Sequence, residues 1–245
     1  MSDWLEYDWE WEQQPISVKV DMQYWQLLPT LAYSHLVYIA CAPRDPEARG
    51  FNRAESRALG QLFDTLQREL EDEAIYVGAI ETEALHQFYF YTANPALITR
   101  AAELCSTQPK LLTSYGEVHE PTYATYYRFL FPDDAKLQSV ENAAHIRDVA
   151  RHGGDLNLVR RITMMLVFPT FEGRETFIRQ LPEIGLSVGV TETREHKTHP
   201  FCVTVYGYST LHLMDLNRCT ARAIRAAAPQ DGILEEIDSE FIEKH

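Results

Sequence analysis

The chain has 245 residues, a length that suits one large domain or two small ones. Its hydrophobic content of 45% is that of an ordinary soluble globular protein, and its formal net charge of −14 argues against direct nucleic-acid binding, because a phosphate backbone would repel it. The same acidity suits a protein that docks on a basic partner surface. No apolar run approaches the length of a membrane span and the acidic start is unlike a signal peptide, so we expect no membrane association and a cytoplasmic location.

The N-terminal segment is rich in tryptophan. A short strand carries two of these side chains on one face, residues 13–15 can turn, and residues 16–20 alternate in a second strand. We therefore expect an N-terminal hairpin that extends a sheet. Two roles are open for the tryptophans: covering the sheet edge and filling core, which we favour, or presenting a stacking surface to a ligand or partner. The four tryptophans are Trp4, Trp9, Trp11 and Trp25.

Residues 31–118 predict the order strand, helix, strand, strand, helix, strand. The first strand, over 31–41, is rich in Tyr, Leu, Val and Ile. Asn52 is expected to cap the helix that follows, and Glu55 stands where a capping box requires an acidic side chain. The apolar stripe of this helix predicts packed core rather than a cofactor site.

The hairpin in this region has an aromatic second arm. Residues 86–92 read HQFYFYT, with phenylalanines on one face and tyrosines on the other. Such a strand resembles the base-stacking platform of an RNA-recognition sheet, but it lacks interleaved Lys or Arg, so we expect aromatic packing within the sheet. Asn94 is then expected to cap the second helix with Pro95 at its first position, and residues 111–117 return as a strand.

Residues 119–160 connect this region to the rest of the chain. The first part is aromatic and contains prolines, which makes it too apolar for a flexible linker. Asp133 is expected to cap a helix over Ala135 to Arg151, with Leu137, Val140 and Ala144 on one side. Two consecutive glycines then end the helix.

Residues 161–242 repeat the same order of elements. The first strand alternates with a period of two, as a half-buried strand does. Thr170 is expected to cap a helix that stops before Gly185, and a hairpin with a polar, charged loop follows. Ser209 or Thr210 is expected to cap the second helix, after which a turn leads into the last strand.

The element order of both regions predicts the fold class. We expect an α+β protein built from two tandem ferredoxin-like (βαββαβ) sandwiches, each an antiparallel sheet with helices on one face. The expected divisions are a first domain over 1–132 that includes the hairpin, a linker helix and turn over 133–160, and a second domain over 161–245. An exposed strand edge in either domain could pair two chains, so a homodimer is an open alternative to a monomer.

Two sets of side chains are of types that can bind a metal ion. The polar loop of the second region contains four residues of metal-binding type, but a solvated charged loop is the favoured interpretation. Four scattered cysteines favour buried free thiols over a disulfide framework or a zinc site. The loop residues are Glu192, Glu195, His196 and His199, and the cysteines are Cys41, Cys105, Cys202 and Cys219.

Catalytic motifs are missing from the sequence. It contains no nucleophile elbow, Walker A loop, dinucleotide fingerprint or zinc-protease helix motif. Glu117 and His119 share one strand face and could pair as a base and its orienting group, but no nucleophile can be assigned to them. We therefore assign no catalytic, cofactor-binding or metal-binding residue, and we expect a protein that is not an enzyme.

The first region resembles the bacterial domain of unknown function 695. The resemblance is carried by the Trp-rich start and by two segments, YVGAIETEALHQFYFYTA at 76–93 and EPTYATYYRFLFPD at 120–133. Tyr123 stands where that family usually has Trp. The resemblance covers about the first 135 residues and implies no known activity.

The second region resembles the regulator of ribonuclease E activity B family. It is carried by GGDLNLVRRITMMLVFPTFEGRETFIRQLPEIGLSV at 153–188 and by the Asp231-Gly232 turn after the last helix. The sequence departs from the family at 161–163, where a His is frequent, and at Ile233, where Trp is usual. The two families occur fused in this order, and the resemblance implies a ferredoxin-like domain in an inhibitor-type protein that binds an endoribonuclease.

Together these features predict a non-enzymatic regulatory or adapter protein whose partner is another protein, a ribonuclease by the resemblance. Two alternatives stay open. One is a small-molecule-binding or enzymatic domain with an aromatic pocket between the domains. The other is an immunity-like protein that sequesters a basic nuclease, which the net charge of −14 would suit.

Overall fold

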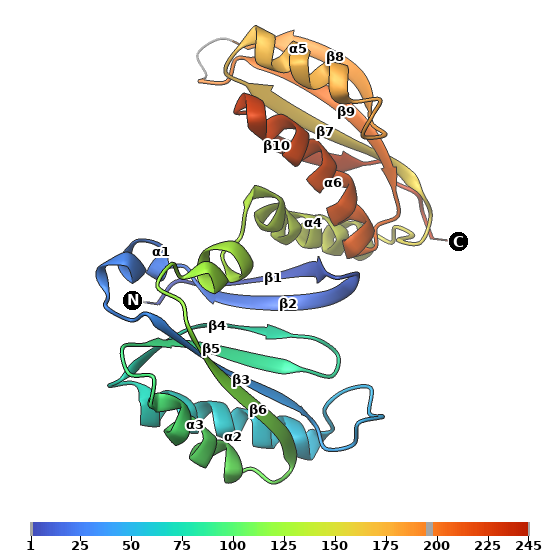
Figure 1. Ribbon diagram of the computed structural model, residues 1–245. Coiled ribbons are helices and arrows are strands. Elements are labelled where there is room, and N and C mark those ends of the chain that lie inside the picture. The colour runs from blue at the N-terminus through green and yellow to red at the C-terminus, as the bar shows by residue number, and fades with distance from the viewer. Residues whose placement is uncertain (1, 195–197, 245) are drawn as a thin grey trace. The chain divides into compact units, whose positions relative to one another are not determined.

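The computed structural model describes residues 2–194 and 198–244. The chain divides into two compact units, Met1–Pro132 and Asp133–His245 (Figure 1). Each unit contains an antiparallel sheet with helices packed on one face, so the α+β prediction of two tandem ferredoxin-like sandwiches is confirmed. Among the described residues, no helix is both long and apolar enough to cross a membrane.

The first unit has a six-stranded antiparallel sheet in the order β1-β2-β4-β5-β3-β6. The last four strands of that order form the ferredoxin-like arrangement, and the N-terminal hairpin extends it because β2 pairs with β4, as predicted. The strands are β1 (Trp4–Trp11), β2 (Gln14–Asp21), β3 (His35–Pro43), β4 (Ala74–Glu81), β5 (His86–Thr92) and β6 (Leu111–His119).

Two helices, α2 (Arg53–Leu70) and α3 (Leu97–Ser106), cover one face of this sheet (Figure 1). The predicted capping box is confirmed: Asn52 Oδ1 accepts from the Glu55 amide, and Glu55 Oε2 accepts from the Asn52 amide. The predicted start of α3 is wrong by two residues. Asn94 Oδ1 accepts from the amide of Ala96, which forms a separate turn before the helix begins.

The opposite face of the sheet is partly covered by short helical segments. These are α1 (Tyr24–Leu27), the 3₁₀ turn η1 (Leu28–Thr30) and the π-helical η2 (Thr125–Leu130). Buried tyrosine hydroxyls fasten η2 to the N-terminal hairpin: Tyr126 donates to the Asp21 carbonyl at 2.8 Å, and Tyr7 donates to the Leu130 carbonyl at 2.9 Å. The aromatic segment that the sequence marked as too apolar for a linker is therefore packed against the sheet.

The second unit has a four-stranded antiparallel sheet in the order β10-β7-β9-β8, the ferredoxin-like order. Helices α5 and α6 lie on the same side of it (Figure 1). Thr170 caps α5, as predicted, by accepting from the Gly173 amide. The elements are β7 (Arg160–Phe168), α5 (Phe171–Gln180), β8 (Ser187–Thr193), β9 (Phe201–Ser209), α6 (Leu213–Ala227), the 3₁₀ turn η3 (Ala228–Gln230) and β10 (Ile233–Ser239).

The predicted cap of α6 is wrong. The N-cap position belongs to His212, and its side chain makes no cap hydrogen bond. Thr210 instead donates from Oγ1 to Asp215 Oδ2 at 2.6 Å. The hydroxyl thus donates to a carboxylate in the first turn of the helix, and it accepts from the amide of His212, the residue before the helix, at 3.3 Å.

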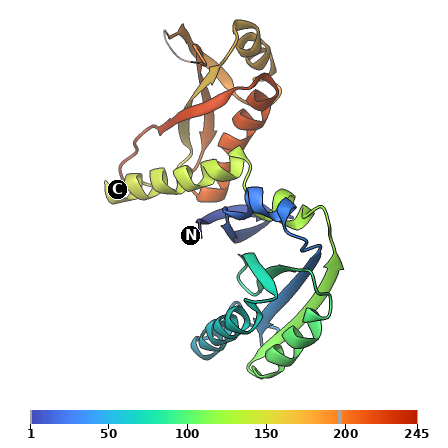
Figure 2. The ribbon, with the colours of Figure 1, turned by 90° about the vertical axis from the view of Figure 1, so that its left-hand side faces the viewer.

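Helix α4 (Asp134–Arg151) begins after Asp133, whose side chain caps it as predicted. It was expected as part of a linker over 133–160, but it belongs to the second compact unit and crosses α6 (Figure 2). The side of this helix that carries Leu137 is not the buried one, because Leu137 is 41% exposed while Ala135, Ser139, Asn142 and Val149 are buried. The buried side therefore combines apolar side chains with polar ones.

Candidate protein-binding surface

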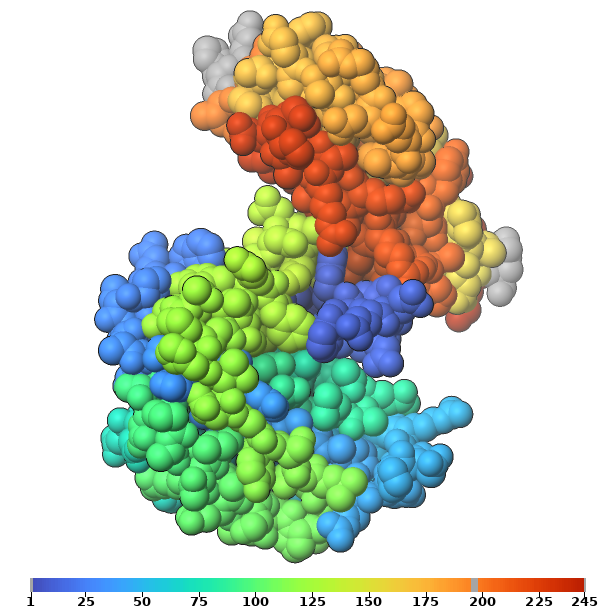
Figure 3. All heavy atoms as spheres, viewed as in Figure 1, coloured from blue at the N-terminus to red at the C-terminus, as the bar shows by residue number. Residues whose placement is uncertain are grey.

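The second sheet has one face turned away from its helices, here called the outer face. Strand alternation decides which side chains lie there: Ile162, Met164 and Leu166 enter the helix-covered core, so Arg161 and Thr163 between them point outward. In the space-filling view, atoms of α5 and α6 cover much of the near side of this unit (Figure 3). The outer face is the side opposite them.

Two tyrosines of β9 and one arginine of β7 form a cluster on the outer face. Tyr208 is 67% exposed, and the Arg161 guanidinium lies 5.1 Å from the ring centroid of Tyr206. Gly189 on β8 leaves room for this ring, since a Cβ there would come within 2.7 Å of Tyr206 Cε2. Ile233 on β10 pairs with Val167 and adds a half-exposed apolar side chain to the same face.

Arg194, just after β8, lies against the outer face and joins three strands. Its Nε donates to Glu192 Oε1 at 2.7 Å, its Nη1 donates to Glu235 Oε2 at 3.3 Å, and its Nη2 lies 2.8 Å from Met165 Sδ. The hydrogen bond to Glu192 raises the pKa of Arg194 above its usual value. The guanidinium is therefore a fixed part of this face, held by partners from β8, β7 and β10.

The loop that the sequence offered as a weak metal site is only partly within the described residues. Glu192 pairs with Arg194, and His199 Nε2 lies 3.0 Å from the Asp231 carbonyl oxygen. Glu195 and His196 lie outside the described residues. Over residues 2–194 and 198–244, no group of three or more His, Cys, Asp or Glu side chains could hold a metal ion.

Glu117 and His119 share one face of β6, but the structure brings a third residue to them. His35 Nδ1 on β3 lies 2.6 Å from Glu117 Oε1, and the His35 and His119 rings are 4.9 Å apart. The cross-strand register explains this, since His35 pairs directly with His119. The sequence pointed to the two β6 residues but missed His35, because strand pairing between distant segments decides it.

The four cysteines are free and buried, as predicted. Burial raises the pKa of Cys41 to about 12 and that of Cys105 to about 11, and it also raises the pKa of Cys219. These thiols therefore stay protonated near neutral pH and make poor nucleophiles.

The aromatic strand β5 is core, as predicted, and offers no platform for bases. Phe88 and Phe90 pack against the helices, while Tyr89 and Tyr91 are buried on the opposite face. The Tyr91 hydroxyl donates to Glu120 Oε1 at 2.8 Å. All four rings are hidden from solvent, so bases cannot stack on them.

The tryptophans were expected to cover a sheet edge and to fill core, and the second part is wrong. Trp4 packs on Tyr76 at 5.2 Å, and Trp25 stacks on Phe131 at 4.3 Å, yet both remain exposed over more than a third of their surface. They lie on the sheet periphery because the hairpin and α1 that carry them are peripheral elements.

Comparisons with known proteins agree with the division into units. Residues 2–131 match the family of unknown function DUF695, and residues 139–238 match regulator of ribonuclease activity B. No curated protein matches the chain. One matching solved structure, an unknown protein from Galdieria sulphuraria, is 9% identical with a TM-score of 0.23 and covers 85% of this chain and 98% of that one.

Both predicted resemblances are therefore confirmed, in the predicted order. The DUF695 match covers almost the whole first unit and more than half of the chain. The second match covers most of the second unit, from Ser139 within α4 to Asp238 on β10. The chain belongs to the family of unknown function DUF695, with a second unit similar to regulator of ribonuclease activity B.

Proposed function

We propose that this protein is a non-enzymatic regulator that binds a ribonuclease through the outer face of its second sheet. The observation that carries the proposal is the match of residues 139–238 to regulator of ribonuclease activity B. That match includes every strand of the second sheet up to Asp238 on β10. We propose that the encounter takes place in the cytoplasm, where the sequence led us to expect the protein.

The outer face has the chemistry of a protein-binding surface. Exposed Tyr and Arg side chains are enriched at binding hot spots, because each offers a large contact area together with hydrogen-bonding groups. Tyr208 and Arg161 supply them here, and Ile233 adds an apolar contact. Their surroundings are acidic as well, since Glu236 and Asp238 on β10 pair with outer-face positions of β7 and are exposed.

Two further features support a protein partner. The backbone of a hydrogen-bonded sheet is ordered before a partner binds, and the interaction of Arg161 with Tyr206 restricts the Arg161 side chain as well. Less conformational entropy is therefore lost on binding. The net charge of −14 would attract a basic partner surface and speed its association, as electrostatic steering does.

The experiment is a binding and inhibition assay with ribonuclease E from the same host. We expect the full chain to bind the purified enzyme and to slow its cleavage of an RNA substrate. Tyr208→Ala and Arg161→Ala should each weaken binding by roughly tenfold or more, the loss typical of a hot-spot side chain.

Tyr115→Ala is the matched control, because Tyr115 is an exposed tyrosine on β6 of the first unit. It should leave binding unchanged. Absence of binding by the unaltered chain at low salt would refute the ribonuclease partner. Binding that Tyr208→Ala and Tyr115→Ala weaken equally would refute the outer face as the contact surface.

A further inference from the structure

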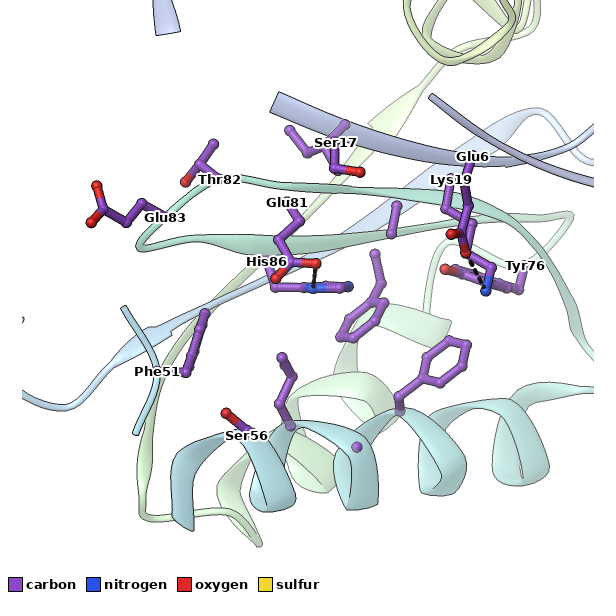
Figure 4. A pocket seen from close by; sticks show the side chains of 16 residues that line it. Glu6, Ser17, Lys19, Phe51, Ser56, Tyr76, Glu81, Thr82, Glu83 and His86 are labelled. Carbon is purple, nitrogen blue, oxygen red and sulfur yellow. Dashed lines mark ion pairs between the residues drawn. The ribbon is translucent and has the colours of Figure 1, made fainter. Parts of the chain in front are cut away.

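The first unit contains a pocket that the ribonuclease proposal does not use. It has a volume of about 580 Å³ and lies between α2 on one side and strands β2, β4 and β5 on the other (Figure 4). The pocket forms because the N-terminal hairpin widens the sheet past the four strands of the ferredoxin-like core. One wall is therefore sheet and the other is the side of a single helix.

The inner wall of the pocket is aromatic. Phe63 of α2 stacks on Phe88 of β5, with ring centroids 4.9 Å apart and planes 15° apart. Tyr76 meets Phe63 edge-on at 4.9 Å, and the His86 ring lies 4.5 Å from Phe88. Such a wall offers π faces and ring edges to an apolar stem and to a cation.

An exposed carboxylate, that of Glu81, lies beside the ring of His86 in this pocket. The Nδ1 atom of His86 is buried and has no hydrogen-bond partner, although the Glu81 carboxylate lies 3.7 Å away, beyond hydrogen-bond length. Burial and the positive charge of Lys19 lower the pKa of His86 to about 4, so the ring is neutral near pH 7.

The cation that lines the pocket is already engaged. Lys19 Nζ lies 3.1 Å from Glu6 Oε1 and 5.4 Å from the ring centroid of Trp4. Glu81 and Glu83 add two exposed carboxylates on the side of the pocket away from Lys19 (Figure 4). An anionic ligand would meet these carboxylates, whereas a cationic ligand would complement them.

Gly60 keeps the helix side of the pocket open. It lies in the interior of α2, where glycine costs about 1 kcal/mol relative to alanine. A Cβ built at Gly60 would meet no atom within 4 Å, so packing does not require the glycine, and its φ is not in the left-handed region. The missing side chain instead leaves free space at the pocket wall.

We propose that this pocket binds a guanidinium group on an apolar stem, as in the arginine side chain. The stem would lie along the wall of Phe63, Tyr76 and Phe88. The guanidinium would donate two parallel hydrogen bonds to the Glu81 carboxylate. The site lies wholly within the first unit and is independent of the ribonuclease proposal.

The geometry favours guanidinium over ammonium. A guanidinium group has donors on separate nitrogens in a planar fork, so it can serve two acceptors side by side. It is also less strongly hydrated than an ammonium group and loses less on entering an apolar pocket. The two oxygens of the exposed Glu81 carboxylate stand side by side, an arrangement that such a fork matches.

The test is a titration of the full chain with N-acetyl-arginine amide, followed by NMR of the methyl groups of Ala79 and Ile80, which line the pocket. We expect saturable shifts at both methyls. N-acetyl-citrulline amide, which has the same shape without the charge, and N-acetyl-lysine amide should each bind at least about tenfold more weakly, a difference of about 1.4 kcal/mol.

Two variants locate the site. Gly60→Leu should fill the pocket and abolish the shifts, and Glu81→Gln should weaken binding several-fold, while Glu103→Gln on exposed α3 serves as the control. Absence of saturable shifts in the unaltered chain would overturn the proposal. So would arginine binding that survives both Gly60→Leu and Glu81→Gln.

A second arm identifies the source of the guanidinium group. The probe is a capped five-residue alanine peptide with arginine at its centre. Binding at least about tenfold tighter than that of N-acetyl-arginine amide would support a partner protein's side chain as the ligand, and equal binding would support a small molecule. Peptide binding that tolerates citrulline in place of arginine would overturn the guanidinium assignment.

Discussion

Asn142 on α4 donates a hydrogen bond of 2.8 Å to Asn217 Oδ1 on α6, and both side chains are buried. The same amide nitrogen donates to Thr220 Oγ1 at 2.9 Å, and Thr220 donates to the carbonyl of Leu216 one turn earlier. A slip of either helix would break both hydrogen bonds of the Asn142 amide nitrogen in a buried setting. The network therefore fixes the register of α4 on α6.

Replacing Asn142 by Leu should lower the free energy of unfolding of the second unit by about 2–3 kcal/mol, because Asn217 Oδ1 and Thr220 Oγ1 lose a buried donor. Urea unfolding of the full chain measures the change. All four tryptophans lie in the first unit, so circular dichroism should show a shifted transition while tryptophan fluorescence keeps its midpoint. The exposed Leu137→Ala on the same helix should shift neither. Equal effects at both positions would contradict the network.

Local sequence signals predict the two ends of helix α4 but not its buried face. Its start at Asp133 and its end near Arg151 follow from local signals, namely a side-chain cap and two glycines, and both are confirmed. Its buried face does not, because apolar periodicity marked Leu137, whereas α6 presents amide and hydroxyl groups that select Asn142. A polar interface leaves no trace in a hydrophobic pattern.

The sites depend on long-range pairing in the same way. Alternation along β7 placed Arg161 outward, but only the β7–β9 register brings it over Tyr206. The pocket exists because β2 pairs with β4, which sets Lys19 beside Ala79. The order of the elements is enough to predict the fold class. Which side chains from distant strands become neighbours can be predicted only when the pairing register is known.

The buried thiols predict the reactivity of the cysteines. In the native chain at mildly alkaline pH, a thiol reagent such as 5,5′-dithiobis(2-nitrobenzoate) should modify essentially none of the four cysteines, because all are buried and burial raises the pKa of Cys41, Cys105 and Cys219. In denaturant all four should react. Rapid modification of a thiol in the native chain would show that one of these elements opens locally.

Gly60 predicts a stabilising substitution. Gly60→Ala should raise the free energy of unfolding by about 0.5–1 kcal/mol, because alanine suits the interior of a helix and its Cβ meets no atom within 4 Å. Thermal unfolding measures the change. Gly173→Ala on α5 should not bring this gain in stability, since its Cβ would lie only 3.0 Å from Thr170 Oγ1 and 3.3 Å from Gln230 Cβ. A loss of stability in Gly60→Ala would mean that the pocket wall is closed.

His86 predicts an acid sensitivity located in the first unit. Its folded pKa of about 4 lies below the ordinary value of 6.5, so the unfolded chain takes up the proton first. The contribution of the neutral His86 to the free energy of unfolding is fully present above about pH 6.5. It is lost as the pH falls toward 4, by up to roughly 3 kcal/mol. Lys19, Glu6, Glu81 and Glu83 are the charged groups that line the pocket around the ring, while the α2 residues that line it carry no charge.

The variant His86→Phe removes this titration and keeps a ring against Phe88. Tryptophan fluorescence in urea at a series of pH values measures the unfolding of the first unit, where all the tryptophans lie. The decline between pH 6.5 and 4 should be shallower in His86→Phe than in the unaltered chain. His152→Gln changes an exposed histidine of the second unit and should leave the decline as it is. Parallel curves for His86→Phe and the unaltered chain would show that carboxylates, and not this buried imidazole, set the acid stability of the unit.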